Sequence, residues 1–159
     1  MDNRIEKLKD MQTSLLIDVV KNYKKYNYPL EFRVEALKIL EQRGIKADTL
    51  SLSGNLNNTK YEEAIIEYKK YNLNSLIALI FHIISAILLK ESGVISIIFY
   101  LVSLVFIGLS FLNSKKISTL AKNEKTDYSF VFLLISSFFY FIMFFFLRKN
   151  LKDQIDTIN

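Results

Sequence analysis

The 159-residue sequence contains no cysteine and no tryptophan, and only one histidine and one proline. A chain without cysteine cannot form a disulfide or a thiolate metal site, and one histidine cannot form a histidine cluster within one chain. The sequence also lacks a glycine-rich phosphate loop, a G-x-S-x-G turn and an H-E-x-x-H helix. We therefore expect no cofactor, no metal and no enzymatic activity.

Charge is absent from three long segments. No Asp, Glu, Lys or Arg occurs in residues 73–89, 93–114 or 128–147, which are mostly apolar. A helix needs about 17–25 such residues to cross a bilayer, whereas a membrane barrel needs many strands of alternating polarity. The sequence therefore predicts an all-α integral membrane protein with a transmembrane domain at 73–147, made of helices at about 73–89, 93–113 and 128–147. The first segment is the shortest, so a tilted or partly interfacial segment is the alternative there.

The residues before the first apolar segment have the periodicity of amphipathic helices in water. We expect a helix over 5–23 with a break near Thr13, and a second helix from Pro29 that ends at Gly44 in a Schellman motif. The second helix is expected to pack on the first through one apolar stripe: Leu30, Val34, Leu37 and Leu40.

These patterns divide the chain outside the membrane into four parts. Residues 1–45 are predicted to be a small helical cytoplasmic module, and residues 46–58, rich in Ser, Gly and Asn, a linker loop. Residues 59–72 are predicted to form a juxtamembrane helix, opened by a capping box of Thr59 and Glu62. Residues 148–159 are predicted to be a short helical C-terminal tail.

The pentapeptide YKKYN occurs at residues 23–27 and again at 68–72, directly before the first apolar segment. In the second copy tyrosine rings flank lysines, and both side chains favour the headgroup layer of a membrane. Two more lysines follow the second apolar segment, and there they can touch anionic lipid. We predict six membrane-interface anchors: Tyr68, Lys69, Lys70, Tyr71, Lys115 and Lys116.

The lysines and arginines beside the apolar segments also predict an orientation. With three crossings, more of them fall on the N-terminal side than on the other side, which places the N-terminus in the cytoplasm and the C-terminus outside the cytoplasmic membrane of a bacterium. No cleavable leader is expected, because the first 70 residues contain no continuous apolar stretch. Arg148 and Lys149 do not fit this orientation. They are explained if the tail is cytoplasmic and one segment does not cross.

One polar layer is expected inside the membrane. His82 lies near the centre of the first apolar segment, and antiparallel packing places the following residues near its depth: Tyr100, Ser103, Ser137 and Tyr140. An ionisable group at this depth suggests a proton or ion path. The competing interpretation, which we favour, is a neutral histidine that hydrogen-bonds a hydroxyl and joins helices, contributing about 0.6 kcal/mol.

Outside the membrane, Glu62, Glu63 and Glu67 share one short helix, and catalysis by these carboxylates is the only acid–base chemistry that the sequence leaves open. We interpret them as a capping group and a solvated face.

The stretch YNYPLEFRVEALKILEQRGI resembles a segment of small bacterial membrane proteins in which Tyr and Pro precede a helix ending in Arg-Gly-Ile. The resemblance covers about 20 residues and implies a portable helical hairpin but no activity.

By elimination, the sequence predicts a non-catalytic accessory protein that binds a protein partner at or in the membrane. A complex subunit, an assembly factor and an immunity-type protector are all consistent with it, and a homo-oligomer is also expected. The alternative is a small oligomeric channel that conducts protons through the His82 layer. The net charge of +5 is spread among interspersed acidic and basic residues, so we expect no nucleic-acid partner.

Overall fold

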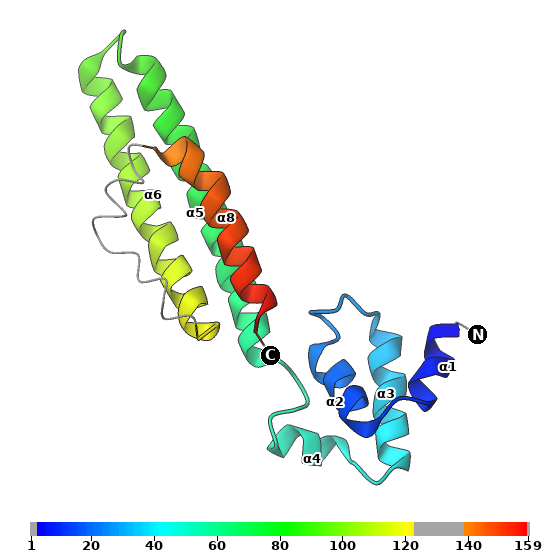
Figure 1. Ribbon diagram of the computed structural model, residues 1–159. Coiled ribbons are helices and arrows are strands. Elements are labelled where there is room, and N and C mark those ends of the chain that lie inside the picture. Colours follow the sequence, from blue (N-terminus) through cyan, green and yellow to red (C-terminus); the bar gives the residue numbers. More distant parts are fainter. Residues whose placement is uncertain (1–2, 123–138, 159) are drawn as a thin grey trace. The chain divides into compact units, whose positions relative to one another are not determined.

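The computed structural model describes residues 3–122 and 139–158, and every regular element in these two ranges is an α-helix (Figure 1). The predicted all-helical class is thus confirmed. The chain divides into two compact units, residues 1–61 and residues 62–158, which we call unit 1 and unit 2. Each unit is described by itself.

Unit 1 contains four helices: α1 (Asn3–Lys9), α2 (Thr13–Asn22), α3 (Leu30–Gln42) and α4 (Ala47–Leu52). The predicted helix over 5–23 is interrupted at residues 10–12, because Gln12 is extended and α2 starts after it. The Schellman ending of α3 is confirmed. Gly44 has a positive φ of 86°, and the N–H of Ile45 donates to the carbonyl of Leu40 at 2.9 Å. The core contains fully buried leucine and valine side chains: Leu8, Leu16, Val20 and Leu40.

The apolar stripe of α3 differs from the predicted one. Leu40 is buried and Leu37 packs against the core, as expected. Leu30 and Val34, however, are 57% and 43% exposed, and Phe32 and Ala36 are buried in their place. Periodicity could not decide between the two faces, because positions 32, 36 and 39 repeat with the same spacing as 30, 34 and 37. Two arginines fix the face by binding backbone carbonyls elsewhere in unit 1.

Arg33 Nε donates to the carbonyl of Val20 at 3.3 Å, and Arg43 donates to that of Met11 at 2.7 Å. Each of these bonds ties α3 to a neighbouring segment. The prediction that 46–58 is a loop was wrong for its first half, because α4 occupies Ala47–Leu52. A helix of six residues spans fewer than two turns, so its apolar residues repeat too few times to be recognised in the sequence. It is held by the burial of Leu50 in the core.

The N-terminal cap of α5 (Thr59–Leu88) also differs from the prediction. The side-chain oxygen of Asn58 accepts the N–H of Tyr61 at 3.0 Å, so Asn58 is the cap and Thr59 is the first residue of the helix. Asn58 also donates to the side chain of Asn22 at 2.6 Å, and both asparagines are buried. The sequence favours Thr59 as the cap because Thr59 and Glu62 have the spacing of a capping box.

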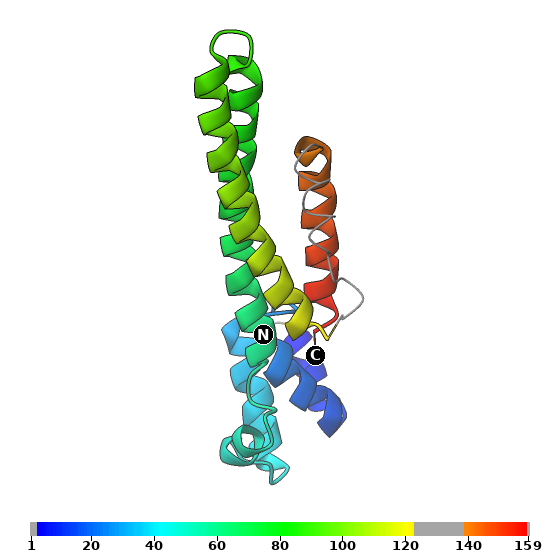
Figure 2. The same cartoon turned by 90° about the vertical axis from the view of Figure 1, so that its left-hand side faces the viewer.

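Unit 2 contains most of α5 together with α6 (Gly93–Leu120) and α8 (Tyr140–Asp156). The predicted juxtamembrane helix and the first apolar segment are one continuous helix, α5. A short turn at residues 89–92 joins α5 to α6, and the two helices run antiparallel (Figures 1 and 2). Both are long and apolar enough to cross a membrane.

The third predicted segment, 128–147, is described only in part. Residues 128–138 lie outside the described ranges, and residues 140–147 form the first half of α8, which continues through the predicted tail to Asp156. Tyr140 O–H donates to the carbonyl of Ser75 at 3.1 Å, and Tyr68 O–H donates to that of Arg148 at 3.4 Å. Helix α8 is therefore antiparallel to α5. It begins part-way along the hairpin and ends near the base, where α5 starts and α6 ends (Figure 2).

Candidate functional site

The interface between α5 and α6 is lined by small side chains. On α6, Ser96, Ser103 and Ser110 recur every seven residues and are buried. Buried side chains of α5 show the same spacing: three small ones, Ala64, Ala78 and Ser85, and the larger Tyr71. A repeat of seven is the pattern by which two helices stay in contact along a left-handed crossing, and small residues let their backbones approach closely. We call this interface the serine seam.

Hydrogen bonds cross the serine seam in its half nearer the turn. Ser85 Oγ donates to the carbonyl of Ser96 at 2.9 Å, and Ser96 Oγ donates back to that of Ser85 at 2.8 Å. Ser103, with no exposed surface, donates to the carbonyl of Ala78 at 3.0 Å. Each hydroxyl is thus paired with the opposite helix, which fixes the register of the hairpin.

Large apolar side chains cover the outside of unit 2. Helices α5, α6 and α8 each present exposed Leu, Ile, Val or Phe residues over the greater part of their apolar segments. The exposed residues include Leu73, Ile80, Ile87, Val94, Ile97, Leu101, Val105, Leu112, Phe141, Ile142, Phe145 and Phe146. Unit 2 therefore buries serine hydroxyls beside a small apolar cluster, which includes Leu79, Ile107 and Phe144, and exposes many branched and aromatic side chains.

The structure brings together part of the predicted polar layer. The ring of His82 lies 5.8 Å from that of Tyr100 and 6.1 Å from that of Tyr140, measured between centroids. Ser103 and Tyr140 belong to the same region but bond to backbone carbonyls of α5, one turn or more away from His82. Ser137 lies outside the described residues. Among the described residues, the buried Nδ1 of His82 has no hydrogen-bond partner.

A buried carboxylate joins the two helices near the base of the hairpin. Glu67, six residues before the apolar segment begins at Leu73, is only 4% exposed. It accepts hydrogen bonds from Lys70 at 2.9 Å, Asn113 at 2.8 Å and Lys116 at 3.2 Å. The interpretation of Glu67 as part of a solvated face was therefore wrong. Sequence reasoning missed it because its partners on α6 are more than 45 positions away along the chain.

The charges around Glu67 explain its ionisation. The hydrogen bond from Lys70 is the largest influence, and with Asn113 and Lys116 it outweighs burial and holds the pKa of Glu67 at about 2. In turn Glu63, 2.9 Å from Lys116, and Glu67 raise the pKa of that lysine. Glu67 is therefore ionised at neutral pH and joins α5 to α6 through Asn113 and Lys116.

The six predicted interface anchors lie near Glu67. Tyr68 and Tyr71 stack with their ring centroids 6.3 Å apart, and Tyr71 is buried, whereas Lys69 and Lys70 are exposed. Lys115 and Lys116 are exposed on the last part of α6. The structure thus places the four lysines at the base of the hairpin.

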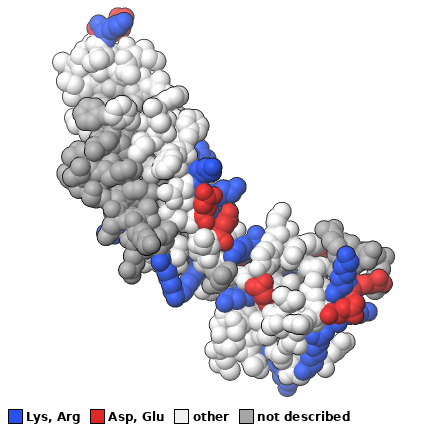
Figure 3. Space-filling model, in the orientation of Figure 1, with Lys and Arg blue, Asp and Glu red and all other residues white. Residues whose placement is uncertain are grey.

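The charged residues of unit 2 are separated by location. At the turn, the described residues carry only Lys90 and Glu91, and the next charges lie near the base. Figure 3 shows this on one face: blue and red atoms at the hairpin end, then an uncharged stretch, then further charges. Because α8 returns to the base, Arg148, Lys149 and Lys152 join the lysines of α5 and α6 there.

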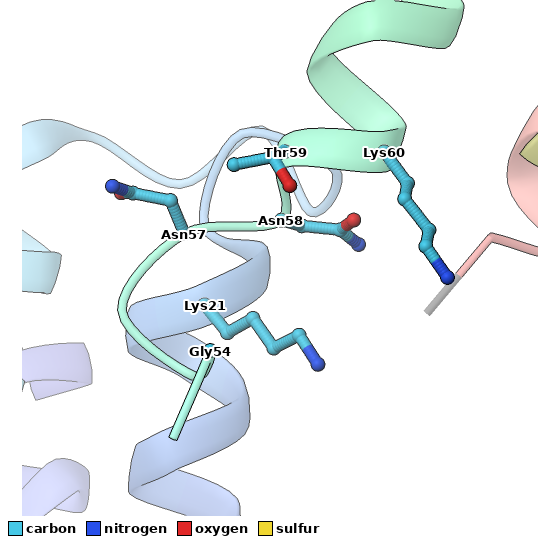
Figure 4. A pocket seen from close by; sticks show the side chains of 6 residues that line it. All are labelled: Lys21, Gly54, Asn57, Asn58, Thr59 and Lys60. Carbon is cyan, nitrogen blue, oxygen red and sulfur yellow. The ribbon is translucent and has the colours of Figure 1, made fainter. Parts of the chain in front are cut away.

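A surface pocket of about 180 Å³ lies in unit 1 beside the start of α5 (Figure 4). Its lining residues come from α2, the segment after α4 and the first turn of α5: Lys21, Gly54, Asn57, Asn58, Thr59 and Lys60. Asn57 already accepts a hydrogen bond from Arg33 at 2.7 Å, and Lys21 contacts Asn55 at 3.5 Å. Together with the Asn22–Asn58 bond, these contacts show that polar side chains of the pocket already serve to hold α2, α3 and the segment after α4 together.

In the described residues, no three side chains of the types His, Cys, Asp and Glu lie close enough together to hold a metal ion. No protein-family model, curated protein or solved structure matches the chain. The arrangement of polar, charged and apolar residues is therefore the guide to function.

Proposed function

We propose that this protein is a non-catalytic accessory protein of the bacterial cytoplasmic membrane, with unit 2 embedded in the bilayer and unit 1 available to a protein partner. The observation that carries the proposal is the reversed polarity of unit 2. Its buried residues include many serines, and its exposed residues are mainly Leu, Ile, Val and Phe. In water this arrangement leaves a large apolar surface uncovered, whereas a lipid environment solvates it.

The path of α8 supports a topology in which both ends of unit 2 face the cytoplasm. Helix α8 ends at the base of the hairpin, where α6 also ends, and we propose that the chain between them does not cross the membrane. With that change the described lysines and arginines near the apolar segments all lie on one side, except for Lys90 in the turn. This asymmetry agrees with the positive-inside rule better than three crossings do.

The topology is tested with single cysteines, since the natural chain has none. Cysteine in place of Ser53, Ser92 or Thr157 is probed in intact cells with an impermeant maleimide. We expect labelling only at position 92, in the turn. Labelling at both 92 and 157 would restore the three-crossing topology, and labelling at 53 would reverse the orientation. Cells opened with detergent provide the control that every site can react.

Membrane embedding has its own test. We expect the full chain to sediment with membranes and to resist extraction at alkaline pH, because its apolar helices are inserted and not adsorbed. Recovery of the protein in the alkaline supernatant would contradict the proposal. Partners are then captured by crosslinking in cells, detergent extraction and mass spectrometry, with a chain lacking residues 1–58 as the comparison. The accessory role requires a partner that the full chain captures. Loss of this partner from the shortened chain would assign binding to unit 1, and its retention would assign binding to unit 2.

A second candidate function is an oligomeric channel that conducts protons. The observation that favours it is the buried Nδ1 of His82, which has no partner in the described residues and lies between two tyrosine rings. An unpaired polar atom at membrane depth costs free energy, so its presence calls for an explanation, and function is one. The competing explanation is a hydrogen bond to a neighbouring copy or to water.

Proton flux through liposomes containing purified protein distinguishes the two functions. We expect no flux above that of empty liposomes for the wild type or for His82→Gln, whose amide does not titrate near neutral pH. A wild-type flux that depends on pH and disappears in His82→Gln, with the variant still inserted, would promote the channel and reject the accessory role.

A further inference from the structure

We infer that the base of the hairpin is a binding surface for anionic phospholipid headgroups, formed by a belt of lysines from three helices. The belt consists of exposed side chains on α5, α6 and α8: Lys69, Lys115, Lys149 and Lys152. The inference rests on the proposed membrane embedding of unit 2 and names the lipid class that it selects.

The first argument is that the three helices meet at one level. The bond from Lys116 to Glu67, at 3.2 Å, places the end of α6 beside α5, and the bond from Tyr68 to the carbonyl of Arg148, at 3.4 Å, places α8 beside the same turn. Lys69, Lys115 and Lys149 are each next to one of the residues that make these bonds. The belt is thus fixed by the fold and does not depend on a flexible tail.

The second argument is the depth of the belt. Lys69 lies four residues before Leu73, and Lys149 two residues after Leu147, where the apolar segments begin and end. At a rise of 1.5 Å per residue, these positions are within about 6 Å of the hydrocarbon boundary. An ammonium group on a flexible four-carbon stem reaches the phosphate layer from there.

The third argument is that these four lysines are available. Lys70 and Lys116 are engaged by Glu67, and Lys116 also by Glu63. Within the described ranges, no ion pair involves Lys69, Lys115, Lys149 or Lys152. Asp153 and Asp156 are on the same helix as Lys149 and Lys152, and Asp153 directly follows Lys152, but in the described part of the chain neither is paired with a belt lysine and four lysines outnumber them. The belt therefore presents net positive charge to the headgroups, and each such charge attracts an anionic surface.

The test uses the full chain in vesicles of phosphatidylcholine that contain spin-labelled phosphatidylglycerol or spin-labelled phosphatidylcholine. We expect the wild type to immobilise the anionic probe about threefold more strongly than the zwitterionic one, less so at high salt. A variant with Lys69, Lys115, Lys149 and Lys152 all changed to Gln should lose this preference. Its helicity, measured by circular dichroism, should match that of the wild type.

A matched control removes four charges from unit 1 by changing Lys7, Lys9, Lys38 and Lys46 to Gln. This control has the same net charge as the belt variant, but its belt is intact. We therefore expect the preference to persist in it. An equal preference in the wild type and the belt variant would overturn the inference, and so would an equal loss in the control. If the wild type shows no preference and the belt variant instead loses a captured acidic protein, the belt binds protein and the lipid assignment fails. Alkaline extraction separates these results from failure of the proposed function, since only release from the membrane rejects both.

Discussion

Units 1 and 2 are both helical, yet their side chains are sorted in opposite ways. In unit 1 the core consists mainly of Leu, Ile and Val with Phe32 and Ala36, and most lysines and glutamates face outward. In unit 2 the interior of the hairpin includes serines from both helices, and Ile, Leu and Phe face outward. The difference agrees with the proposal that lipid surrounds unit 2 and water surrounds unit 1. Burial of apolar area stabilises unit 1, whereas close packing and interhelical hydrogen bonds must hold unit 2 together, because lipid solvates leucine as well as a protein core does.

The largest effect is expected in the core of unit 1. Leu40 has no exposed surface, and Leu40→Ala should lower the free energy of unfolding by about 2–5 kcal/mol. Leu30 is the matched control on the same helix, because it is mostly exposed, and Leu30→Ala should change stability by less than about 0.5 kcal/mol. Hydrogen exchange of residues 1–61 during urea denaturation of the full chain measures both. Equal effects would mean that another molecule covers Leu30.

Enlarging a residue of the serine seam should be the next most harmful change. Ser103→Leu adds apolar volume where the backbones of α5 and α6 approach, and overpacking of this kind costs roughly 1–3 kcal/mol. Ser103→Ala removes only the bond to Ala78, worth about 0.6 kcal/mol. Dissociation of the hairpin is followed in detergent micelles through a dye pair on cysteines introduced at Ile66 and Leu112, which are exposed. If leucine stabilised the hairpin, the seam would not be closely packed.

Acid should weaken the base of the hairpin through Glu67. Its pKa is lowered from 4.5 to about 2, so its contribution is complete above about pH 4.5 and is lost as the pH falls toward 2. Glu67→Gln should cost roughly 1–3 kcal/mol at pH 7, since a charge-assisted contact is replaced by a neutral one. The same dye pair, read between pH 7 and pH 3, should show the difference between wild type and variant shrinking with acid. A constant difference would mean that folding does not lower the pKa of Glu67.

The smallest effect is expected on the outer face of α6. Val105 is 62% exposed, and Val105→Ala should change hairpin stability by less than about 0.5 kcal/mol in micelles, because the side chain exchanges lipid contacts for other lipid contacts. This inverts the result at Leu40, where the same kind of truncation is severe. A loss above about 1 kcal/mol would show that Val105 is buried against another copy or a partner.

The sequence was sufficient for the features that depend on local patterns. The charge-free stretches predict the apolar parts of α5 and α6, and Gly44 predicts the end of α3, since each signal lies within the element that it describes. The face of α3 could not be predicted in the same way. It depends on Arg33 and Arg43, whose acceptors are in other segments.

The candidate site shows the same division. Counting along antiparallel helices was enough to place His82 near Tyr100, but the burial of Glu67 requires Lys116 and Asn113 from a helix that starts 26 residues later. The serine seam did leave a signal in the sequence, the seven-residue spacing of Ser96, Ser103 and Ser110. That spacing is visible only when serine is counted with the small residues that line membrane interfaces instead of with the polar residues of water-soluble helices.

The pairing of the seam hydroxyls also bears on how the protein is made. Ser110 and Ser114 donate to carbonyls three residues earlier in their own helix, at 2.8 Å each, whereas Ser85, Ser96 and Ser103 bond across the hairpin. A serine that has not yet met its partner can satisfy its hydroxyl in the first way. On the proposed embedding of unit 2, each helix could therefore enter lipid with its serine hydroxyls satisfied within the helix. These hydroxyls would change partners when the hairpin closes. The same serines would then serve insertion of the single helices first and set the register of the pair afterwards.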